Sequence, residues 1–565
     1  MNATPDGRGT EPGLAPGGDL PPLLRWLGGL DERRALALFL GASLLLTLAA
    51  ALSSDSVFQV DEYFQVIEFT SHKLGVTPGS ALPWEFAARM RGWTQPGLYY
   101  LLARGAMAAG IHDPFALTRA FRVASGLVAW SALVAIVLAT RAWFPARPWR
   151  PAVACSLALA YHAPYLAART SSESGATSFL LLGLALLVGP GAGGGLAARA
   201  PARRLLAAGA ALGLAFECRY QVGLAIAGLM LWLLLRGRER WRTFALTGAG
   251  LAAVLALGVL VDAWGYGGFA LVPWNYLRVN VFEDRAAGFG TMPPYAYAGI
   301  LLLTFPPFGA ALLAGLLLLW WRRPGHLLTW LTAPFVIGHS LIGHKEFRFL
   351  FPMLAPAALG LLLLWSGPEA RAGRGAALLR RLRALWFSRA VWALDLAAVL
   401  LLCLLPSSDN FGLQRYFREH GYAGRWVGFT DPLRAHGIET PFLWPRPLPP
   451  VAVVRSVAEL ARAADASPVP LLVAAKYPLP DGAADFLARR AERVFVSLPP
   501  FVARLNLFHW VDRADLTYVY RIPPALPGKT AGAPGKGRAP PRAATRRRPP
   551  GRRGPRAPAP AAPRR

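Results

Sequence analysis

Long apolar runs separated by short polar connections dominate the first two thirds of this 565-residue chain. A helix needs about 20 apolar residues, with a lower limit near 17, to cross the hydrocarbon core of a bilayer. Runs near this length lie at roughly 36–52, 122–140, 151–167, 175–189, 205–217, 221–235, 244–261, 298–320, 327–343, 349–365 and 390–405. The pattern predicts an all-α polytopic membrane protein with about eleven transmembrane helices, extending over residues 35–406.

The long polar connection at residues 53–121 differs from the other connections because it contains helical patterns of its own. Between Val57 and Glu68, apolar Val60, Phe64 and Ile67 share one helical face, and polar Asp61, Gln65 and Glu68 share the adjacent face. Such a segment is expected to lie on the membrane surface. Asp61 would then sit at the boundary between lipid and water.

The two ends of the chain have separate patterns. Residues 1–34 are rich in Pro, Gly and charge and show no apolar run with a cleavage site, so we expect a disordered cytoplasmic N-terminus and an uncleaved first span. Residues 407–525 combine an amphipathic helix at 451–464 with strand-like runs at 471–475, 494–498 and 516–522, which predicts a small outer α/β domain. Residues 526–565 consist mainly of Pro, Ala, Gly and Arg and are expected to be a disordered tail.

Composition and charge place this pattern in a membrane. Apolar residues make up 54% of the chain and charged residues only 16%, and the net charge of +29 comes mostly from arginine. The arginines form clusters in alternate connections, at 141–150, 199–204, 236–242, 322–323 and 371–389. Clusters of this kind indicate topology rather than nucleic acid as a partner, and they mark the cytoplasmic side. The opposite side has few basic residues in its short loops: Arg169, Arg219, Arg278, Arg285, Lys345 and Arg348.

Two motifs on this non-cytoplasmic side carry candidate chemistry. Asp61 and Glu62 could supply a general base for a substrate hydroxyl, although a solvated pair on an amphipathic helix is the simpler alternative. In the segment from His344 to Phe349, a helix would place Lys345 and Arg348 on one face, with His344 four residues from Arg348. Three such donors at the bilayer surface suit a lipid phosphate, whereas a snorkelling topological cluster is the alternative.

Weaker signals accompany these motifs. Aromatic and polar residues between Asp262 and Tyr297 suit sugar binding, but aromatics also crowd ordinary membrane interfaces. Arg169 with Glu173, and Glu217 with Arg219, are interpreted as local ion pairs. The three cysteines, Cys155, Cys218 and Cys403, lack CxxC spacing and exclude a zinc knuckle or a disulfide scaffold. We expect no cofactor.

In this order the segments resemble glycosyltransferase family 22, the dolichol-phosphate-mannose-dependent α-mannosyltransferases of N-glycan and GPI-anchor assembly. The resemblance covers about residues 57–365, and its sharpest element is the segment from His344 to Pro352, which is similar to the family's HKE-x-RF-x-x-P signature. Asp61 to Gln65 resembles the first-loop motif. Gln59-Val60 stands where the family usually has His-Pro, and Met292 to Tyr295 replaces an expected His and Trp.

The resemblance implies a GT-C fold, an inverting transfer, a lipid-phosphate-linked sugar donor, a glycan or glycolipid acceptor and no metal. It implies that Asp61 is the general base, that Glu62 helps to bind the acceptor and that His344, Lys345 and Arg348 hold the donor phosphate. The residues implied to bind substrate are Glu346, Asp262, Tyr266, Asn275, Asn280, Arg169 and Glu173.

The sequence therefore predicts a membrane mannosyltransferase with its active site on the non-cytoplasmic side. Arg-dominated basic usage and an excess of Ala, Gly and Leu favour a bacterial, high-G+C genome, with a polyprenyl carrier in the plasma membrane; a eukaryotic protein would use dolichol in the endoplasmic reticulum. A transporter or flippase for lipid-linked substrates is the alternative, and it predicts charges deep within broken spans. A membrane scaffold presenting the outer domain would leave both motifs unexplained.

Overall fold

The protein is described by a computed structural model that covers most of the chain between residues 20 and 524. The described residues are 20–53, 57–160, 163–188, 200–236, 239–304, 306–371, 374–404, 410–420, 425–429, 442–443, 451–476, 479–498, 500–506, 509, 511 and 516–524. The predicted tail at 526–565 and the first part of the predicted N-terminal segment lie outside these residues.

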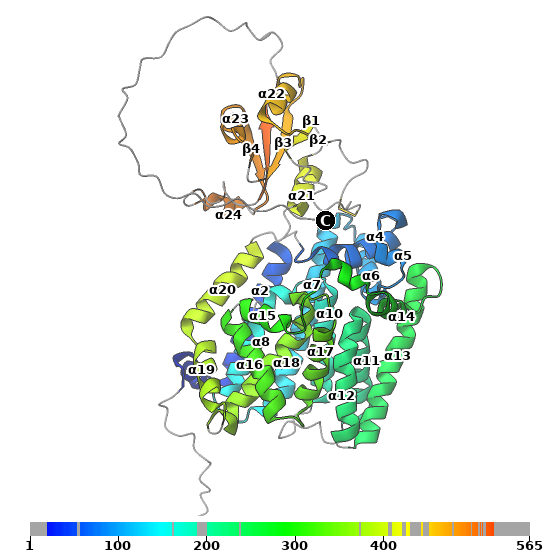
Figure 1. Cartoon of the computed structure of the whole chain (residues 1–565), viewed down its shortest axis with the longest axis vertical. Coiled ribbons are helices and arrows are strands. Elements are labelled where there is room, and N and C mark those ends of the chain that lie inside the picture. Colours follow the sequence, from blue (N-terminus) through cyan, green and yellow to red (C-terminus); the bar gives the residue numbers. More distant parts are fainter. Residues whose placement is uncertain are drawn as a thin grey trace, which may run out of the picture.

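A bundle of mostly apolar helices forms the main body (Figure 1). Its helices are α1 (Pro22–Gly29), α2 (Glu32–Ser53), α7 (Pro114–Ala139), α8 (Trp149–Leu159), α9 (Ala163–Ala167), α10 (Ser172–Leu187), α11 (Ala202–Cys218), α12 (Gly223–Arg236), α13 (Arg240–Tyr266), α15 (Ala296–Leu303), α16 (Pro306–Arg322), α17 (Leu327–Leu341), α18 (Phe351–Ser366), α19 (Ala376–Trp386) and α20 (Arg389–Leu404). Short 3-10 turns lie at η3 (Thr140–Trp143), η5 (Tyr220–Val222), η8 (Phe347–Leu350) and η9 (Pro368–Ala370).

Several of these helices are long and apolar enough to cross a membrane. Among the described residues, four single spans qualify, at Glu32–Ser53, Pro114–Trp143, Arg240–Tyr266 and Phe347–Ser366, and a pair bent by 52° at residues 376–403 would make a fifth. Shorter apolar helices lie at Ser172–Leu187, Tyr220–Arg236, Pro307–Arg322 and Leu327–Leu341. The chain is therefore a multi-pass integral membrane protein.

Two predicted spans are broken. The run at 298–320 forms α15 and α16, and α16 begins at a proline and folds back on α15 so closely that a Cβ at Gly309 would lie 1.7 Å from the Leu301 carbonyl oxygen. The run at 151–167 forms α8 and α9, with Ala160 extended and Pro164 in the first turn of α9. Proline chemistry explains both breaks, which apolar content alone did not predict.

The N-terminal segment predicted to be disordered contains α1. Leu24 and Leu27 are fully buried against the helical bundle, so the apolar face of α1 offsets its ordering entropy. The prediction is wrong for residues 22–29.

Short helices form an outer layer at one end of the bundle. They are α3 (Val60–Glu62), the π-helix η1 (Tyr63–Ile67), α4 (Glu68–Lys73), η2 (Gly79–Ala81), α5 (Trp84–Ala87), α6 (Thr94–Ala108), α14 (Val272–Leu277), the π-helix η6 (Arg278–Phe282) and η7 (Arg285–Phe289).

The segment from Val57 to Glu68 does not lie on the surface as expected. Its polar residues Glu62, Gln65 and Glu68 are buried together with its apolar ones, because each carboxylate or amide has a partner inside the protein. The amphipathic pattern therefore reflects polar and apolar contacts inside the protein, and the expectation of a surface helix between lipid and water is wrong.

The C-terminal part forms a five-stranded mixed sheet in the order β2-β1-β3-β5-β4. Its strands are β1 (Arg425–Gly428), β2 (Val451–Val453), β3 (Leu471–Lys476), β4 (Glu492–Val496) and β5 (Thr517–Ile522), with helices α21 (Asn410–His420), α22 (Val457–Asp465), α23 (Ala483–Arg490) and α24 (Pro500–Arg504). Strands β2, β1 and β3 are parallel to one another, and β5 is antiparallel to both of its neighbours, β3 and β4. The helix expected at 451–464 is strand β2 followed by α22, which begins only after the N-cap Ser456.

The sheet, α21, α4, α5 and α14 lie at the same end of the bundle (Figure 1). The ring of Phe411 in α21 packs 5.1 Å from that of Tyr63 in η1, and Phe442 and Leu443 join the same apolar cluster. Helix α21 thus packs on the layer that carries Asp61.

Candidate active site

The predicted phosphate motif lies at the junction between α17 and α18. Residue Leu341 ends α17, Glu346 is extended, and the turn η8 leads into α18, whose first turn tolerates Pro352. Since His344 to Glu346 are not helical, the expected shared face of His344, Lys345 and Arg348 does not form.

Arg348 is the centre of the site, with three carboxylates around it. Its guanidinium donates to both oxygens of Glu346, at 2.7 and 2.8 Å, and to Oδ2 of Asp61 at 2.6 Å. Its Nε also lies 3.5 Å from Glu173 Oε1. Residues 61, 173 and 346, far apart in sequence, therefore meet at one cation.

Glu173 links Arg348 to a second arginine. Its Oε1 lies 2.8 Å from Nη1 of Arg219, and both side chains are nearly inaccessible to solvent. The expected pair of Arg169 with Glu173 is wrong: Arg169 donates to the Ala50 carbonyl at 3.0 Å. Arg169 precedes the N-cap of α10, so the helical i, i+4 spacing does not apply to it.

The expected pair of Glu217 with Arg219 is also not formed. Glu217 accepts a hydrogen bond from the hydroxyl of Thr94 at 3.2 Å, and Arg219 points toward Glu173. The chain leaves α11 at Cys218 and is extended at Arg219, which turns the two side chains apart.

Glu62 is buried and uses both of its carboxylate oxygens within the protein. One accepts from the backbone N–H of Phe58 at 3.0 Å, and the other accepts from the N–H and hydroxyl of Thr170, at 2.8 and 2.9 Å. These bonds fix the turn that carries Asp61 to the segment before α10. The geometry suits a positioning residue more than a substrate contact.

His344 and Lys345 point to different partners. The ring nitrogens of His344 lie 3.0 Å from the Gly290 carbonyl and 3.1 Å from Glu346. Lys345 donates to the carbonyls of Ile342 and Met292. His344 thus joins the cluster around Arg348, and Lys345 caps the end of α17.

The remaining predicted substrate residues mostly contact one backbone segment. Asp262 accepts from the Trp93 N–H at 2.7 Å, Tyr266 bonds the Arg91 backbone, and Asn275 donates to the Arg89 carbonyl at 3.1 Å. Asn280 donates to the Tyr276 carbonyl, at 3.1 Å. These side chains shape the outer loop rather than lining the cluster around Arg348.

Arg91 and Arg219 were not predicted as site residues. Together with Gln65, Gln95 and Tyr276 they line a space of about 30 Å³. The available signal for Arg219 was its position in a short loop on the side that carries few basic residues, and Arg91 gave no comparable signal.

Charge at the site controls the ionisation of its outer carboxylates. Burial raises the pKa of Asp61, but Arg348, Arg91 and Arg219 together lower it further, so the net pKa is below the ordinary value. Glu346 behaves similarly, since burial raises its pKa and its bonds to Arg348 and His344 lower it more. Both carboxylates are thus ionised at neutral pH.

These features define a multi-pass membrane protein with a compact cluster of charged and polar side chains at one end of its bundle. Residues 38–405 match the profile of the Alg9-like mannosyltransferase family, and the chain belongs to this family.

Individual relatives match parts of the chain. A GPI alpha-1,2-mannosyltransferase 3 of Danio rerio is 36% identical over 168 residues, which are 28% of this chain and 31% of the relative. A GPI mannosyltransferase 3 of Yarrowia lipolytica is 28% identical over 315 residues, 54% of this chain and 58% of the relative. The chain thus aligns with less than two thirds of either relative.

A solved structure of ArnT from Cupriavidus metallidurans, bound to undecaprenyl phosphate, superposes with a TM-score of 0.46 at 16% identity. The superposition covers 88% of this chain and 99% of ArnT.

Proposed function

We propose that the protein is an inverting α-mannosyltransferase that moves mannose from a polyprenyl or dolichyl phosphate carrier to a glycan or glycolipid acceptor. The observation that carries this proposal is the 2.6 Å contact between Asp61 and Arg348. It brings a carboxylate able to take a proton against a guanidinium able to bind phosphate. Membership of the Alg9-like mannosyltransferase family supports mannose as the sugar.

In the proposed reaction, an acceptor hydroxyl attacks the anomeric carbon of the donor mannose and gives its proton to Asp61. The bond from that carbon to the phosphate oxygen breaks, and the carrier phosphate leaves with the electron pair. Arg348, aided by His344, stabilises the charge that develops on the leaving phosphate. Glu62 holds the turn that carries Asp61, and Lys345 holds the turn that carries Arg348.

The ion pair between Asp61 and Arg348 describes the protein before the donor arrives. A donor phosphate would compete with the carboxylates for Arg348. The side chains of Asp61 and Glu346 are 30% and 28% exposed, whereas that of Glu173 is 2% exposed, so Asp61 and Glu346 are the ones it would displace. When the phosphate engages Arg348, Asp61 loses the nearest charge that lowers its pKa. Donor binding would therefore make Asp61 a stronger base.

We further propose a GT-C arrangement with about eleven crossings, with the cluster around Arg348 on the non-cytoplasmic face of the endoplasmic reticulum or plasma membrane. The clustering of arginine in the connections at the opposite end supports this orientation.

The deciding experiment measures mannose transfer from a radiolabelled polyprenyl-phosphate mannose by purified protein. Wild type should transfer the label, and Asp61→Asn should lower kcat by about a hundredfold or more. Asp465→Asn, at the exposed end of α22, serves as the matched carboxylate control and should retain activity. Equal transfer by Asp61→Asn removes Asp61 from the role of base. If wild type moves labelled lipid across vesicles without transferring sugar, the flippase alternative replaces the proposal.

A further inference from the structure

Residues 267–295, which join the end of α13 to the start of α15, carry large apolar side chains on the outside of the protein. Among the exposed ones are Phe269, Trp274, Leu277, Val281, Phe282 and Phe289. The helical part of the segment, α14 with η6, covers only residues 272–282 and is too short to cross a bilayer. An exposed apolar surface of this kind marks contact with a membrane, a ligand or another protein.

The apolar stripe of this short helix faces away from the protein. Trp274, Leu277 and Val281 follow the i, i+3, i+7 spacing of one helical face and are 50%, 41% and 47% exposed. In a helix of a water-soluble protein such a stripe faces the core. The medium around this helix therefore receives its apolar side.

The polar side chains of the same helix are directed toward the protein. Asn275 donates to the Arg89 carbonyl at 3.1 Å, and the Tyr276 hydroxyl accepts a hydrogen bond from Gln221. The guanidinium of Arg91 lies 5.6 Å from the centre of the Tyr276 ring. A helix with its polar side bound to protein and its apolar side turned outward is stable in lipid rather than in water.

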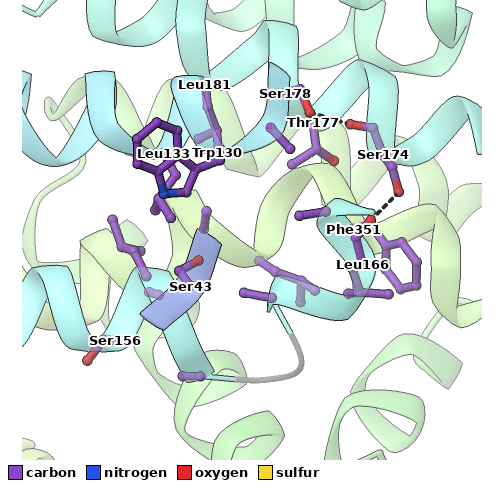
Figure 2. A pocket seen from close by; sticks show the side chains of 18 of the residues that line it. Ser43, Trp130, Leu133, Ser156, Leu166, Ser174, Thr177, Ser178, Leu181 and Phe351 are labelled. Atoms are coloured by element: carbon purple, nitrogen blue, oxygen red, sulfur yellow. Dashed lines mark hydrogen bonds between the residues drawn. The ribbon is translucent and has the colours of Figure 1, made fainter. Parts of the chain in front are cut away.

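Apolar side chains inside the bundle have the opposite orientation. Figure 2 shows Trp130, Leu133 and Leu181 around a cavity of about 120 Å³ between α2, α7, α10 and α18. These side chains are turned toward the interior of the protein, whereas those of residues 267–295 are turned away from it. The exposed stripe is thus a separate feature of this segment.

The lipid-facing side of α13 leads directly into this surface. Leu257, Leu260 and Trp264 lie at i, i+3 and i+7 on α13, and all three are exposed, Leu260 to 67%. Helix α13 is the least buried of the four single spans in the described part of the chain, so this stripe faces hydrocarbon. Phe269, which is 72% exposed, follows Trp264 by only five residues. The apolar surface of residues 267–295 therefore begins at the edge of the hydrocarbon region.

The other side chains of the segment suit the headgroup region. Arg278 lies beside Leu277 in the stripe, is 51% exposed and pairs with Glu283 at 3.4 Å. Arginine reaches headgroups from apolar surroundings by its long stem, and Trp and Tyr concentrate at the same depth. Both features match phospholipid as the partner of this surface.

The same segment contacts the predicted phosphate motif. The Gly290 carbonyl lies 3.0 Å from a ring nitrogen of His344, and the Met292 N–H donates to the Gly343 carbonyl at 2.9 Å. The Met292 carbonyl accepts from Lys345 at 2.9 Å. The depth of the segment in a bilayer would therefore set the depth of the motif.

We propose that residues 267–295 insert their apolar face into the interfacial region of the leaflet at this end of the bundle, with phospholipid as the partner. This insertion holds the motif from Gly343 to Arg348 at the depth of the lipid headgroups. The inference concerns the bulk phospholipid of the membrane and does not depend on the donor, the acceptor or the reaction.

The test measures depth with a nitroxide label on introduced cysteines, in full-length protein in phosphatidylcholine nanodiscs. Labels replace Phe269 and Phe282, with Leu260→Cys on α13 as the lipid control and Val453→Cys, at a half-exposed position of β2, as the water control. Electron paramagnetic resonance compares collisions of each label with oxygen, which concentrates in lipid, and with a nickel chelate, which stays in water. The signal from the three native cysteines is recorded on wild type and subtracted.

We expect the ratio of oxygen to nickel collisions at both labels to approach that at Leu260→Cys and to exceed that at Val453→Cys by about tenfold. A ratio equal to that at Val453→Cys would place the segment in water and overturn the proposal, leaving a glycan or another protein as the partner. Trp274→Cys repeats the measurement if a phenylalanine variant does not fold.

A second measurement tests the link to the motif. The double variant Phe269→Ser with Phe282→Ser weakens insertion, so amide hydrogen exchange at residues 343–349 should be faster by about threefold or more. Val453→Ser, on the sheet, should leave this exchange unchanged. Equal exchange in the double variant and in wild type would overturn the claim that insertion holds the motif. Neither measurement requires sugar transfer, so failure of the proposed function would leave both results interpretable.

Discussion

In the proposed mechanism, Arg348 binds two partners in turn, first Asp61 and then the donor phosphate. Three carboxylates surround its guanidinium, and Arg219 shares one of them, so the buried charges nearly balance before any substrate enters. Unpaired charge at this depth would be costly. A phosphate can replace Asp61 at Arg348 because it brings a negative charge of its own.

The depressed pKa of Asp61 predicts the pH dependence of activity. In the free enzyme the carboxylate remains ionised well into the acid range, so kcat/KM for the donor should show no loss from Asp61 until the pH falls below the ordinary aspartate range. With donor bound, the acid limb of kcat should lie at higher pH. Arg348→Gln should move the acid limb of kcat/KM to higher pH, whereas the control Arg322→Gln should leave the limb in place. An unmoved acid limb in Arg348→Gln would contradict the effect of Arg348 on the pKa of Asp61.

Glu173 gives a prediction about stability. Replacing it by Gln leaves Arg219 and Arg348 buried without a shared counter-charge, which should lower the free energy of unfolding by about 3 kcal/mol. Thermal unfolding in detergent measures the change. Asp465→Asn, which removes the exposed pair with Arg490, is the control and should have little effect. A similar small effect of Glu173→Gln would argue that water reaches the pair.

At the scale of elements, the apolar runs predicted the helices well, since α2, α7, α10, α11, α12, α13, α17, α18 and α20 lie where the runs do. The interruptions at Pro164 and Pro306 were not predicted, because hydropathy counts apolar area and ignores backbone hydrogen bonding. Site positions such as Asp61 and Arg348 could be found from residue type and sidedness. The meeting of Asp61 and Glu173 at Arg348 could not be found, because it depends on how three separate elements pack.

Close contact between α11 and α13 offers a test at this scale. A Cβ at Gly209 would lie 1.9 Å from the Thr247 carbonyl oxygen, and a Cβ at Gly250 would lie 2.1 Å from that of Leu206. Gly209→Ala should therefore force the helices apart and lower the free energy of unfolding by about 1–3 kcal/mol. Gly248→Ala on α13, where the nearest atom is 3.6 Å away, should be tolerated. Equal unfolding midpoints for both variants would contradict this packing.

For the whole molecule, the mixed sheet and the bundle meet at the layer that carries the proposed base. Phe411 packs against Tyr63, which lies two residues after Asp61, and Arg418 pairs with Asp113 at 3.0 Å at the start of α7. Helix α21, which packs on the sheet, thus makes both an apolar and a charged contact with the segment at residues 53–121.

This attachment predicts an effect on catalysis from a residue remote from the chemistry. Phe411→Ala should lower kcat roughly tenfold, because small displacements of a catalytic group reduce rates steeply. Phe486→Ala, a similar truncation within the sheet's own apolar cluster, should leave kcat unchanged. Steady-state transfer assays measure both. An unchanged kcat in Phe411→Ala would mean that the outer loop holds Asp61 without help from the sheet.

The capping role of Lys345 has a consequence for which insertions and deletions the protein can tolerate. Its ammonium group donates to the backbone at the end of α17 and to the Met292 carbonyl. The same hydrogen-bonding group therefore holds the loop that contacts His344 and the turn that presents Arg348. A change in loop length between Arg285 and Tyr295 would move the Met292 carbonyl that Lys345 binds, and the proposed phosphate site would move with it. This short loop would therefore remain constrained in length even where its side chains vary.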